Sequence, residues 1–333
     1  MPADEPPAEK PRSLAEYAGL PAAQGEDGGS TLTVIVAFAA NLVIAIAKTI
    51  AALVTGSASL VAESAHSWAD AGNEVFLLIA DRRSRREPDA LHPLGFGRES
   101  YVWSMFAALG LFVAGAAVSV TNGIHGLLDP EPASDFLVGY LVLAFSFVFE
   151  GISLLQSARQ AGTEARVMKR DLIAHVLRTS DPTLRAVFFE DSAALIGLLI
   201  AGLALLAHQL TGSPIPDAIG SILVGVLLGM VAIVLINRNR HFLIGEQADP
   251  ALRIAVVKAL LAQQEVDRVT YLRLEIVGPR MINVVGDVDL TGDRAEHDVS
   301  VMLRTLEAKI QQSPAVVGAV LSLSAPDEPS IQV

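Results

Sequence analysis

The chain has 333 residues, of which 52% are hydrophobic, and it has a formal net charge of −12 and no cysteine. A soluble protein of this size is rarely so apolar, which favours a membrane protein. The lack of cysteine excludes disulfides, thiolate metal ligands and a cysteine nucleophile, and the acidic charge argues against nucleic acid as a partner.

The first 30 residues are rich in Pro, Glu, Asp and Gly. Such a composition buries too little apolar surface to form a core, so we expect a disordered acidic tail over residues 1–30. The segment lacks the basic start and apolar centre of a signal peptide, and it is too acidic for a transit peptide.

Six apolar stretches follow, each close to the ~20 residues that span a bilayer. They cover residues 31–54, 57–80, 101–127, 136–157, 184–208 and 214–236. Lys and Arg gather after the second stretch, between the fourth and fifth, and after the sixth. Six spans place these segments and both termini on one side, which the positive-inside rule makes cytoplasmic. We therefore expect a membrane domain over residues 31–240, in the inner membrane of a bacterium.

The second stretch carries four ionisable residues at helical spacing, Glu63, His66, Asp70 and Glu74. At about 100° per residue they fall on one narrow stripe of a helix. Because a charge at the bilayer centre costs about 2.5 kcal/mol or more, this stripe must face protein, water or an ion. His66 and Asp70, one turn apart, can reach the same cation, and their atoms suit a divalent metal such as zinc. The alternative is a structural hydrogen bond between helices that pairs an Asp with the His, without a metal.

Other ionisable residues interrupt the apolar stretches. Glu190 and Asp191 are adjacent, so they diverge by about 100° and only one is expected to face a shared ion. For Asp191 the alternative is a cap or an ion pair with Arg185 at the membrane interface. Glu150 is a candidate fourth ligand, a proton carrier or a partner of a basic loop residue. We expect Lys48 to extend toward the interface.

One further segment gives a weaker signal, and one motif is absent. Asp89 and His92 in the loop after the second stretch are candidate ligands, but two residues do not make a metal site, and ordinary loop polarity is the favoured interpretation. The chain has no Gly-rich phosphate loop, so ATP-driven pumping is not supported.

Beyond residue 240 the pattern is that of a soluble domain. Apolar residues at helical spacing predict helices over 249–264 and 295–312, and apolar runs predict strands over 268–278, 281–290 and 316–324. The order α-β-β-α-β predicts a small α+β domain over residues 241–326 that resembles the ferredoxin-like fold, followed by a tail over 327–333. We expect this domain to serve oligomerisation or sensing.

The segments SASLVAESAHSWAD, HPLGFGRES and EDSAALIGLLIAG, with the small C-terminal domain, resemble the cation diffusion facilitator family over roughly residues 31–325. The resemblance implies an α-helical membrane protein with six transmembrane helices and a cytoplasmic ferredoxin-like domain. It also implies a homodimer that exports zinc or a related divalent ion in exchange for H⁺. The family's tetrahedral site has two ligands on the second helix and two on the fifth, which gives His66, Asp70 and Asp191 here.

This sequence departs from the family pattern at two positions. Four residues before Asp191 stands Val187, which has no metal-binding atom, so Glu190 or Glu150 is expected to substitute. Phe96 stands where many members have a second loop histidine. The segments GFGRES, FEGISLL and DPTLRAVFFEDSAALIG resemble the branch that includes the animal mitochondrial zinc exporter, which favours Zn²⁺ over Mn²⁺, Fe²⁺, Co²⁺ or Cd²⁺.

The expected function is therefore a proton-coupled antiporter that exports zinc from the cytoplasm by alternating access. Two other classes stay open from the residues alone. One is a membrane metalloenzyme that holds a catalytic zinc with the same carboxylates and imidazole. The other is a metal-sensing or structural membrane protein without transport.

Overall fold

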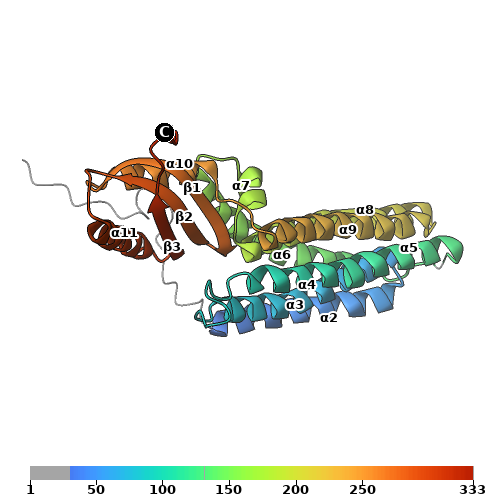
Figure 1. Cartoon of the computed structure of the whole chain (residues 1–333). Coiled ribbons are helices and arrows are strands. Elements are labelled where there is room, and N and C mark those ends of the chain that lie inside the picture. The colour runs from blue at the N-terminus through green and yellow to red at the C-terminus, as the bar shows by residue number, and fades with distance from the viewer. Residues whose placement is uncertain (1–30, 131, 333) are drawn as a thin grey trace, which may run out of the picture. The chain divides into compact units, whose positions relative to one another are not determined.

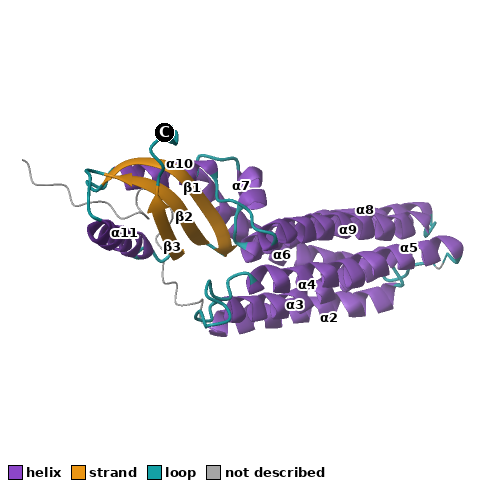
Figure 2. Ribbon diagram, in the orientation of Figure 1, coloured by secondary structure: helices purple, strands orange, loops and turns teal. Residues whose placement is uncertain are grey.

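The computed structural model describes residues 31–130 and 132–332, so the expected acidic tail over residues 1–30 lies outside the described part of the chain. The described chain forms two compact units, which adjoin in the sequence at Ile244 and Gly245. The first unit is built of long helices and the second of helices and a small sheet (Figure 1 and Figure 2).

The helices of the first unit follow the expected apolar stretches. Their bounds are α2 Thr31–Thr55, α3 Ala58–Ser84, α4 Glu99–Gly110, the π-helical η1 Leu111–Ala117, α5 Val118–Leu128, α6 Phe136–Val167, α7 Leu172–Arg178, α8 Pro182–Thr211 and α9 Ile215–Leu243. The segments α4, η1 and α5 are continuous and form one long helix. A mid-helix π-turn of this kind locally widens the helix.

Five segments among the described residues are long and apolar enough to cross a membrane. They are Phe38–Thr55, Glu99–Leu128, Phe136–Val167, Pro182–Thr211 and Ile215–Leu243. The sequence predicted six, and the remaining one is α3. This helix has 27 residues, ample length for a span, but its ionisable stripe and its serines lower its apolar content. The structure buries much of this polar surface, including Glu63, Ser64, His66 and Ser67, while Trp68, Val75 and Leu78 are exposed.

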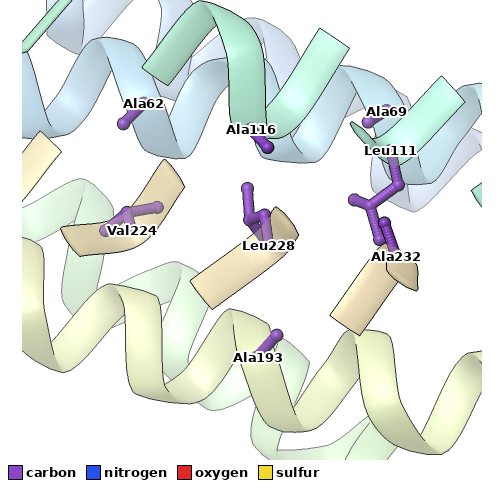
Figure 3. Packing of buried hydrophobic residues seen from close by; sticks show 8 residues of the cluster. All are labelled: Ala62, Ala69, Leu111, Ala116, Ala193, Val224, Leu228 and Ala232. Carbon is purple, nitrogen blue, oxygen red and sulfur yellow. The ribbon is translucent and has the colours of Figure 1, made fainter. Parts of the chain in front are cut away.

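Small side chains let the helices of the first unit approach closely. One buried cluster joins α3, η1, α8 and α9 and consists of Ala62, Ala69, Leu111, Ala116, Ala193, Val224, Leu228 and Ala232. Figure 3 shows these side chains lying between the helices. Between α9 and the η1–α5 helix, a Cβ added at Gly225 would lie 2.9 Å from the Ala116 carbonyl oxygen. Alanine and glycine at such contacts provide the van der Waals packing that holds helices together in lipid.

The second unit has the predicted order α-β-β-α-β. Its elements are α10 Pro250–Leu261, β1 Val266–Gly278, β2 Met281–Leu290, α11 Glu296–Gln311 and β3 Val316–Leu323. The sheet order is β1-β2-β3, with β1 and β2 antiparallel and β2 and β3 parallel. Along β2 every second residue is buried, which is the period expected for a strand covered on one face.

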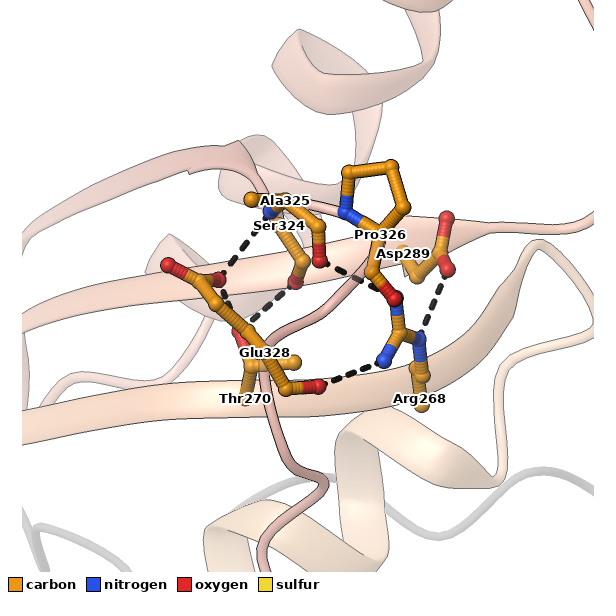
Figure 4. Close-up of polar contacts among 7 residues, drawn as sticks. All are labelled: Arg268, Thr270, Asp289, Ser324, Ala325, Pro326 and Glu328. Atoms are coloured by element: carbon orange, nitrogen blue, oxygen red, sulfur yellow. Dashed lines mark hydrogen bonds and ion pairs between the residues drawn. The ribbon is translucent and has the colours of Figure 1, made fainter.

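Residues 327–332, which fall in the segment expected as a tail, make contacts with this unit. The Ile331 N–H donates a hydrogen bond of 2.8 Å to the backbone of β1. The Arg268 guanidinium donates to the Glu328 carbonyl at 2.6 Å and to Asp289 at 2.7 Å (Figure 4). Alternation and periodicity give no sign of such a segment, since it forms neither a helix nor a strand.

Candidate metal centre

The first turn of α3 is fixed to α9 by a buried carboxylate. Ser57 caps the helix and accepts a hydrogen bond from the Leu60 N–H at 3.2 Å. Asp217, which is 2% exposed, accepts from the Ala58 N–H at 2.6 Å and from the Ser57 hydroxyl at 2.9 Å, and it also contacts the Ser59 hydroxyl. Negative charge is favourable at a helix N-terminus, so Asp217 sets the position of the whole α3 stripe. Sequence reasoning missed this role.

Glu63, the first residue of the stripe, is paired with a cation from α2. Lys48 Nζ lies 3.0 Å from Glu63 Oε2, and both side chains are fully buried. The expectation that Lys48 extends to the membrane interface is therefore wrong. A buried charge is costly unless it is paired, and α2 packs against α3 so that Lys48 meets this carboxylate. Glu63 also contacts α8 at Gly197, where an added Cβ would overlap its Oε1 atom.

His66 and Asp70 lie at the centre of the stripe and face each other without a hydrogen bond. His66 Nε2 is 3.3 Å from Asp70 Oδ1, and the imidazole is 1% exposed. Within the described chain neither ring nitrogen of His66 nor Asp70 Oδ1 has a hydrogen-bond partner. Buried polar atoms are nearly always satisfied, and each exception needs an explanation. A cation between the nitrogen and the oxygen would satisfy both. The two residues are one turn apart on the same helix, and a direct ion pair within α3 is the other arrangement that a separation of 3.3 Å allows.

Glu190 and Asp191 on α8 point to different helices, as their adjacency predicts. The Asn73 amide of α3 donates to Glu190 Oε1 at 2.9 Å, and the Ser153 hydroxyl of α6 donates to Asp191 Oδ2 at 2.7 Å. Glu190 is 7% exposed. Both carboxylates interact electrostatically with Asp70 across the space between α3 and α8.

Glu150 on α6 belongs to the same polar region. Its carboxylate interacts electrostatically with Lys48, Asp70 and His66. The five predicted site residues therefore surround one region between α3, α6 and α8. Still, no three His, Asp or Glu side chains in the described ranges lie close enough together to hold one ion.

Glu74 ends the stripe and contacts α2. The Asn41 amide donates to Glu74 Oε1 at 2.6 Å, while Glu74 Oε2 has no hydrogen-bond partner among the described residues. The stripe thus contacts α2 at both ends, through Glu63 and Glu74, and its unsatisfied pair lies between them.

In the loop after α3, Asp89 and His92 have a structural role. Asp89 Oδ1 accepts from the backbone N–H of His92 at 2.7 Å and of Leu91 at 2.9 Å, and it lies 2.9 Å from His92 Nδ1. The hydrogen bond with the His92 side chain lowers the pKa of the Asp89 carboxyl. The His92 ring packs on Phe96 at 4.3 Å between centroids. These contacts match the interpretation as ordinary loop polarity.

Comparison with known protein families identifies a match within the first unit. A family model described as the cation efflux transmembrane domain matches residues 34–244. The chain is 41% identical to metal tolerance protein C4 of Arabidopsis thaliana over 236 residues, which cover 70% of this chain and 51% of that protein. It is 32% identical to the human mitochondrial proton-coupled zinc antiporter SLC30A9 over 264 residues, 79% of this chain and 46% of that protein.

A bacterial relative is more distant. The chain is 26% identical to the zinc transporter ZitB of Pectobacterium atrosepticum over 218 residues, 66% of this chain and 62% of that protein. The chain spans about half the length of the plant and human relatives. The antiporter and ZitB are named as transporters rather than as enzymes.

Proposed function

Since this chain belongs to the cation efflux, or cation diffusion facilitator, family, we propose that it is an antiporter that exports a divalent metal cation, Zn²⁺ first, in exchange for protons. The observation that carries the proposal is that the ring nitrogens of buried His66 and the neighbouring Asp70 Oδ1 atom are buried without a hydrogen-bond partner among the described residues. An imidazole nitrogen and a carboxylate oxygen are zinc ligands, and a membrane helix that buries them without partners needs a reason to do so.

We assign His66, Asp70 and Asp191 as ligands of the transported ion, with Glu190 or Glu150 in the place that Val187 leaves without a donor. Asp191 and Glu190 reach the ion when α8 moves toward α3 and their hydrogen bonds to Ser153 and Asn73 break. Each of those bonds is worth about 1 kcal/mol, or up to about 3 kcal/mol to a charged group, so ligation of a dication replaces them readily.

Protons drive the exchange because they compete with the metal for the same lone pairs. Neutral imidazole and ionised carboxylates bind the cation, and their protonation from the opposite side releases it. Alternating access then requires that α3 and α8 move relative to each other, which opens the polar region to one side at a time. The small side chains between these helices allow such sliding.

The same proposal covers the topology. We propose that α3 and the five more apolar segments together make six spans, and that neighbouring helices shield α3 from lipid. Both termini then lie on the cytoplasmic side, where the Lys and Arg residues gather. The soluble unit is taken as a ferredoxin-like domain of a homodimer. The names of the animal relatives place those proteins in mitochondria, so the bacterial inner membrane expected for this chain stays a proposal.

Zinc flux into proteoliposomes with an internal fluorescent zinc indicator tests the proposal. Wild-type protein should take up Zn²⁺ and accelerate when the vesicle interior is acidic. The variants His66→Ala, Asp70→Ala and Asp191→Ala should each lose this flux, whereas His125→Ala, which changes an exposed histidine of α5, should keep it. Flux that survives all three ligand substitutions rules out this site.

A metal-sensing or structural protein is the remaining alternative. It predicts zinc binding, or none, without flux in the same vesicles. The names of the relatives do not favour it.

A further inference from the structure

Lys48 places a single fixed positive charge inside the apolar spans. It is the only Lys or Arg residue between positions 31 and 80, and the stretches 99–158 and 186–237 contain none. Its side chain is fully buried, so the charge does not reach the membrane surface. An ionisable residue at such a place is costly and calls for a functional explanation. The antiport mechanism proposed above does not use it.

Polar contacts between α2 and α3 fix the position of this charge. The Thr49 and Ser64 hydroxyls lie 2.7 Å apart, and the Trp68 indole N–H donates to the Thr49 hydroxyl at 3.0 Å. Thr49 and Ser64 directly follow Lys48 and Glu63 in the sequence. The ion pair of Lys48 and Glu63 is therefore built into the packing of the two helices.

The two helices run antiparallel along the ionisable stripe. Asn41 of α2 meets Glu74 near one end of the stripe, and Lys48 meets Glu63 at the other. Residues 42–47 between them have only apolar side chains. Lys48 thus lies beside the unsatisfied pair, next to a carboxylate three residues before His66, and α2 contributes no polar side chain opposite the pair itself.

Glu63 has one oxygen held by Lys48 and one without a partner. Oε2 accepts from Lys48 at 3.0 Å, whereas Oε1 is buried and has no hydrogen-bond partner within the described chain. Residues 63, 66 and 70 share one face of α3, and a carboxylate oxygen is a zinc ligand. Glu63 therefore has the position and the free atom of a further ligand beside His66 and Asp70.

The charge of Lys48 acts differently on the empty and the filled site. Its ammonium is attracted to Asp70 and Glu150 as well as to Glu63. A dication bound at His66 and Asp70 would be repelled by the same ammonium, because like charges inside a protein interact strongly. Lys48 stabilises the empty site relative to the filled one.

We propose that Lys48 sets the affinity of the transport site: it holds the Glu63 carboxylate away from the transported dication and opposes the charge of that ion. This inference rests on the proposed transport function and deepens it. A carrier must bind its ion well enough to capture it and weakly enough to release it. Lys48 contacts Glu63 and not the ion, so it is a positioning residue.

A charge cycle on the full chain in detergent tests the proposal, with Zn²⁺ affinity measured by isothermal calorimetry. Lys48→Met should bind Zn²⁺ roughly tenfold more tightly, a factor that ~1.4 kcal/mol provides and that is modest for charges interacting inside a protein. Lys48→Met/Glu63→Met removes the pair as a neutral unit and should return to the wild-type affinity. Lys48→Arg, which keeps the charge, should also stay close to wild type.

The control is Arg82→Gln, which removes the same charge from an exposed position near the end of α3 and should leave the affinity unchanged. Lys48→Gln, which removes the charge but keeps an amide donor, takes the place of Lys48→Met where that variant does not fold. Damage to the fold weakens binding, so a gain in affinity is a result that a purely structural ion pair does not give. Affinity equal to or weaker than wild type in the uncharged variant overturns the proposal, as does a gain that persists without Glu63.

Zinc flux in proteoliposomes gives a second readout. Lys48→Met should lower both the KM for Zn²⁺ and the maximal rate, because tighter binding slows release. A KM that is unchanged or raised contradicts the proposal. Wild-type zinc binding that is insensitive to His66→Ala and Asp70→Ala ends the transport-site assignment itself, whereas normal wild-type transport without an affinity gain in Lys48→Met ends only this inference.

Discussion

Two pairs of oppositely charged or polar residues involve neighbouring turns of α3, and they differ in whether the two facing atoms are hydrogen-bonded to each other. Lys48 and Glu63 form a hydrogen-bonded ion pair at 3.0 Å, with both side chains fully buried. His66 and Asp70 approach to 3.3 Å without a hydrogen bond. The first pair joins α2 to α3, while the second lies within α3 and joins no helices. The comparison teaches that burial of an ionisable residue does not by itself indicate a ligand.

The two pairs also influence each other. The Lys48 ammonium interacts electrostatically with Asp70 and Glu150 as well as with Glu63. It therefore offsets part of the negative charge around the proposed ion site. A site with fewer uncompensated carboxylates binds a dication less tightly, which favours release of the ion.

The largest effect is expected from the unsatisfied pair. Replacement of His66 or Asp70 by alanine removes a direct ligand, so zinc affinity should fall on the order of 100-fold, since even outer-shell changes cost 10- to 100-fold. Isothermal calorimetry on protein in detergent measures it. Neither variant should lower the free energy of unfolding as much as breaking the Lys48–Glu63 ion pair does, because His66 and Asp70 share no hydrogen bond that the substitution could remove. The exposed His125→Ala variant is the control, and equal affinity loss in this control removes the assignment.

The next effect concerns the buried ion pair of Lys48 and Glu63. Lys48→Met leaves the Glu63 carboxylate buried without a partner, so unfolding should become about 3–5 kcal/mol easier. The double variant Lys48→Met/Glu63→Met replaces both charges by apolar groups and should recover most of that loss. Chemical unfolding in detergent, followed by tryptophan fluorescence, gives both values. If the double variant is as unstable as the single one, the pair is not what the substitution disrupts.

A smaller effect tests how tightly Glu63 is held. A methyl group at Gly197 overlaps Glu63 Oε1, whereas at Gly202 on the same helix nothing lies within 4 Å. Gly197→Ala should therefore destabilise the protein by about 1–3 kcal/mol, as overpacking does. Gly202→Ala should be neutral or stabilise by up to about 1 kcal/mol through helix propensity. The two melting curves are compared directly, and the reverse order contradicts the packing described here.

The smallest effect lies outside the membrane, in the loop of Asp89. Its folded-state pKa is lowered by the hydrogen bond with the His92 side chain, so the loop is stabilised while the carboxylate is ionised. That contribution is present above the unfolded pKa of about 4 and is lost as the pH falls through the folded value. The protection factors of the Leu91 and His92 amides, measured by hydrogen exchange relative to the intrinsic rate at each pH, should fall in this range. Asp89→Asn should abolish the pH dependence, and an unchanged profile in that variant excludes Asp89 as its source.

Local patterns predicted much of the fold. The strand predicted over residues 281–290 is β2, Met281–Leu290, because alternating burial appears directly in the sequence. The ionisable stripe of α3 was visible because charges stand out in an apolar helix. The same charges lower the apolar content of α3 below that of the five membrane-spanning candidates in the described chain. A simple count of apolar stretches overlooks this difference.

Contacts between distant segments could not be predicted. Lys48 and Glu63 are 15 residues apart on different helices, and Asp217 is 159 residues from the Ala58 amide that it accepts from. No periodicity encodes which residues of two packed helices meet. For the same reason the sequence did not show that Glu190 faces Asn73 while Asp191 faces Ser153.

An anomalous difference map at the zinc absorption edge, from the protein prepared with Zn²⁺, tests the central claim most directly. The account predicts a peak between His66 Nε2 and Asp70 Oδ1, with a carboxylate of α8 or α6 drawn into contact. A protein that carries zinc but shows its peak away from α3, with His66 and Asp70 uncoordinated, contradicts it.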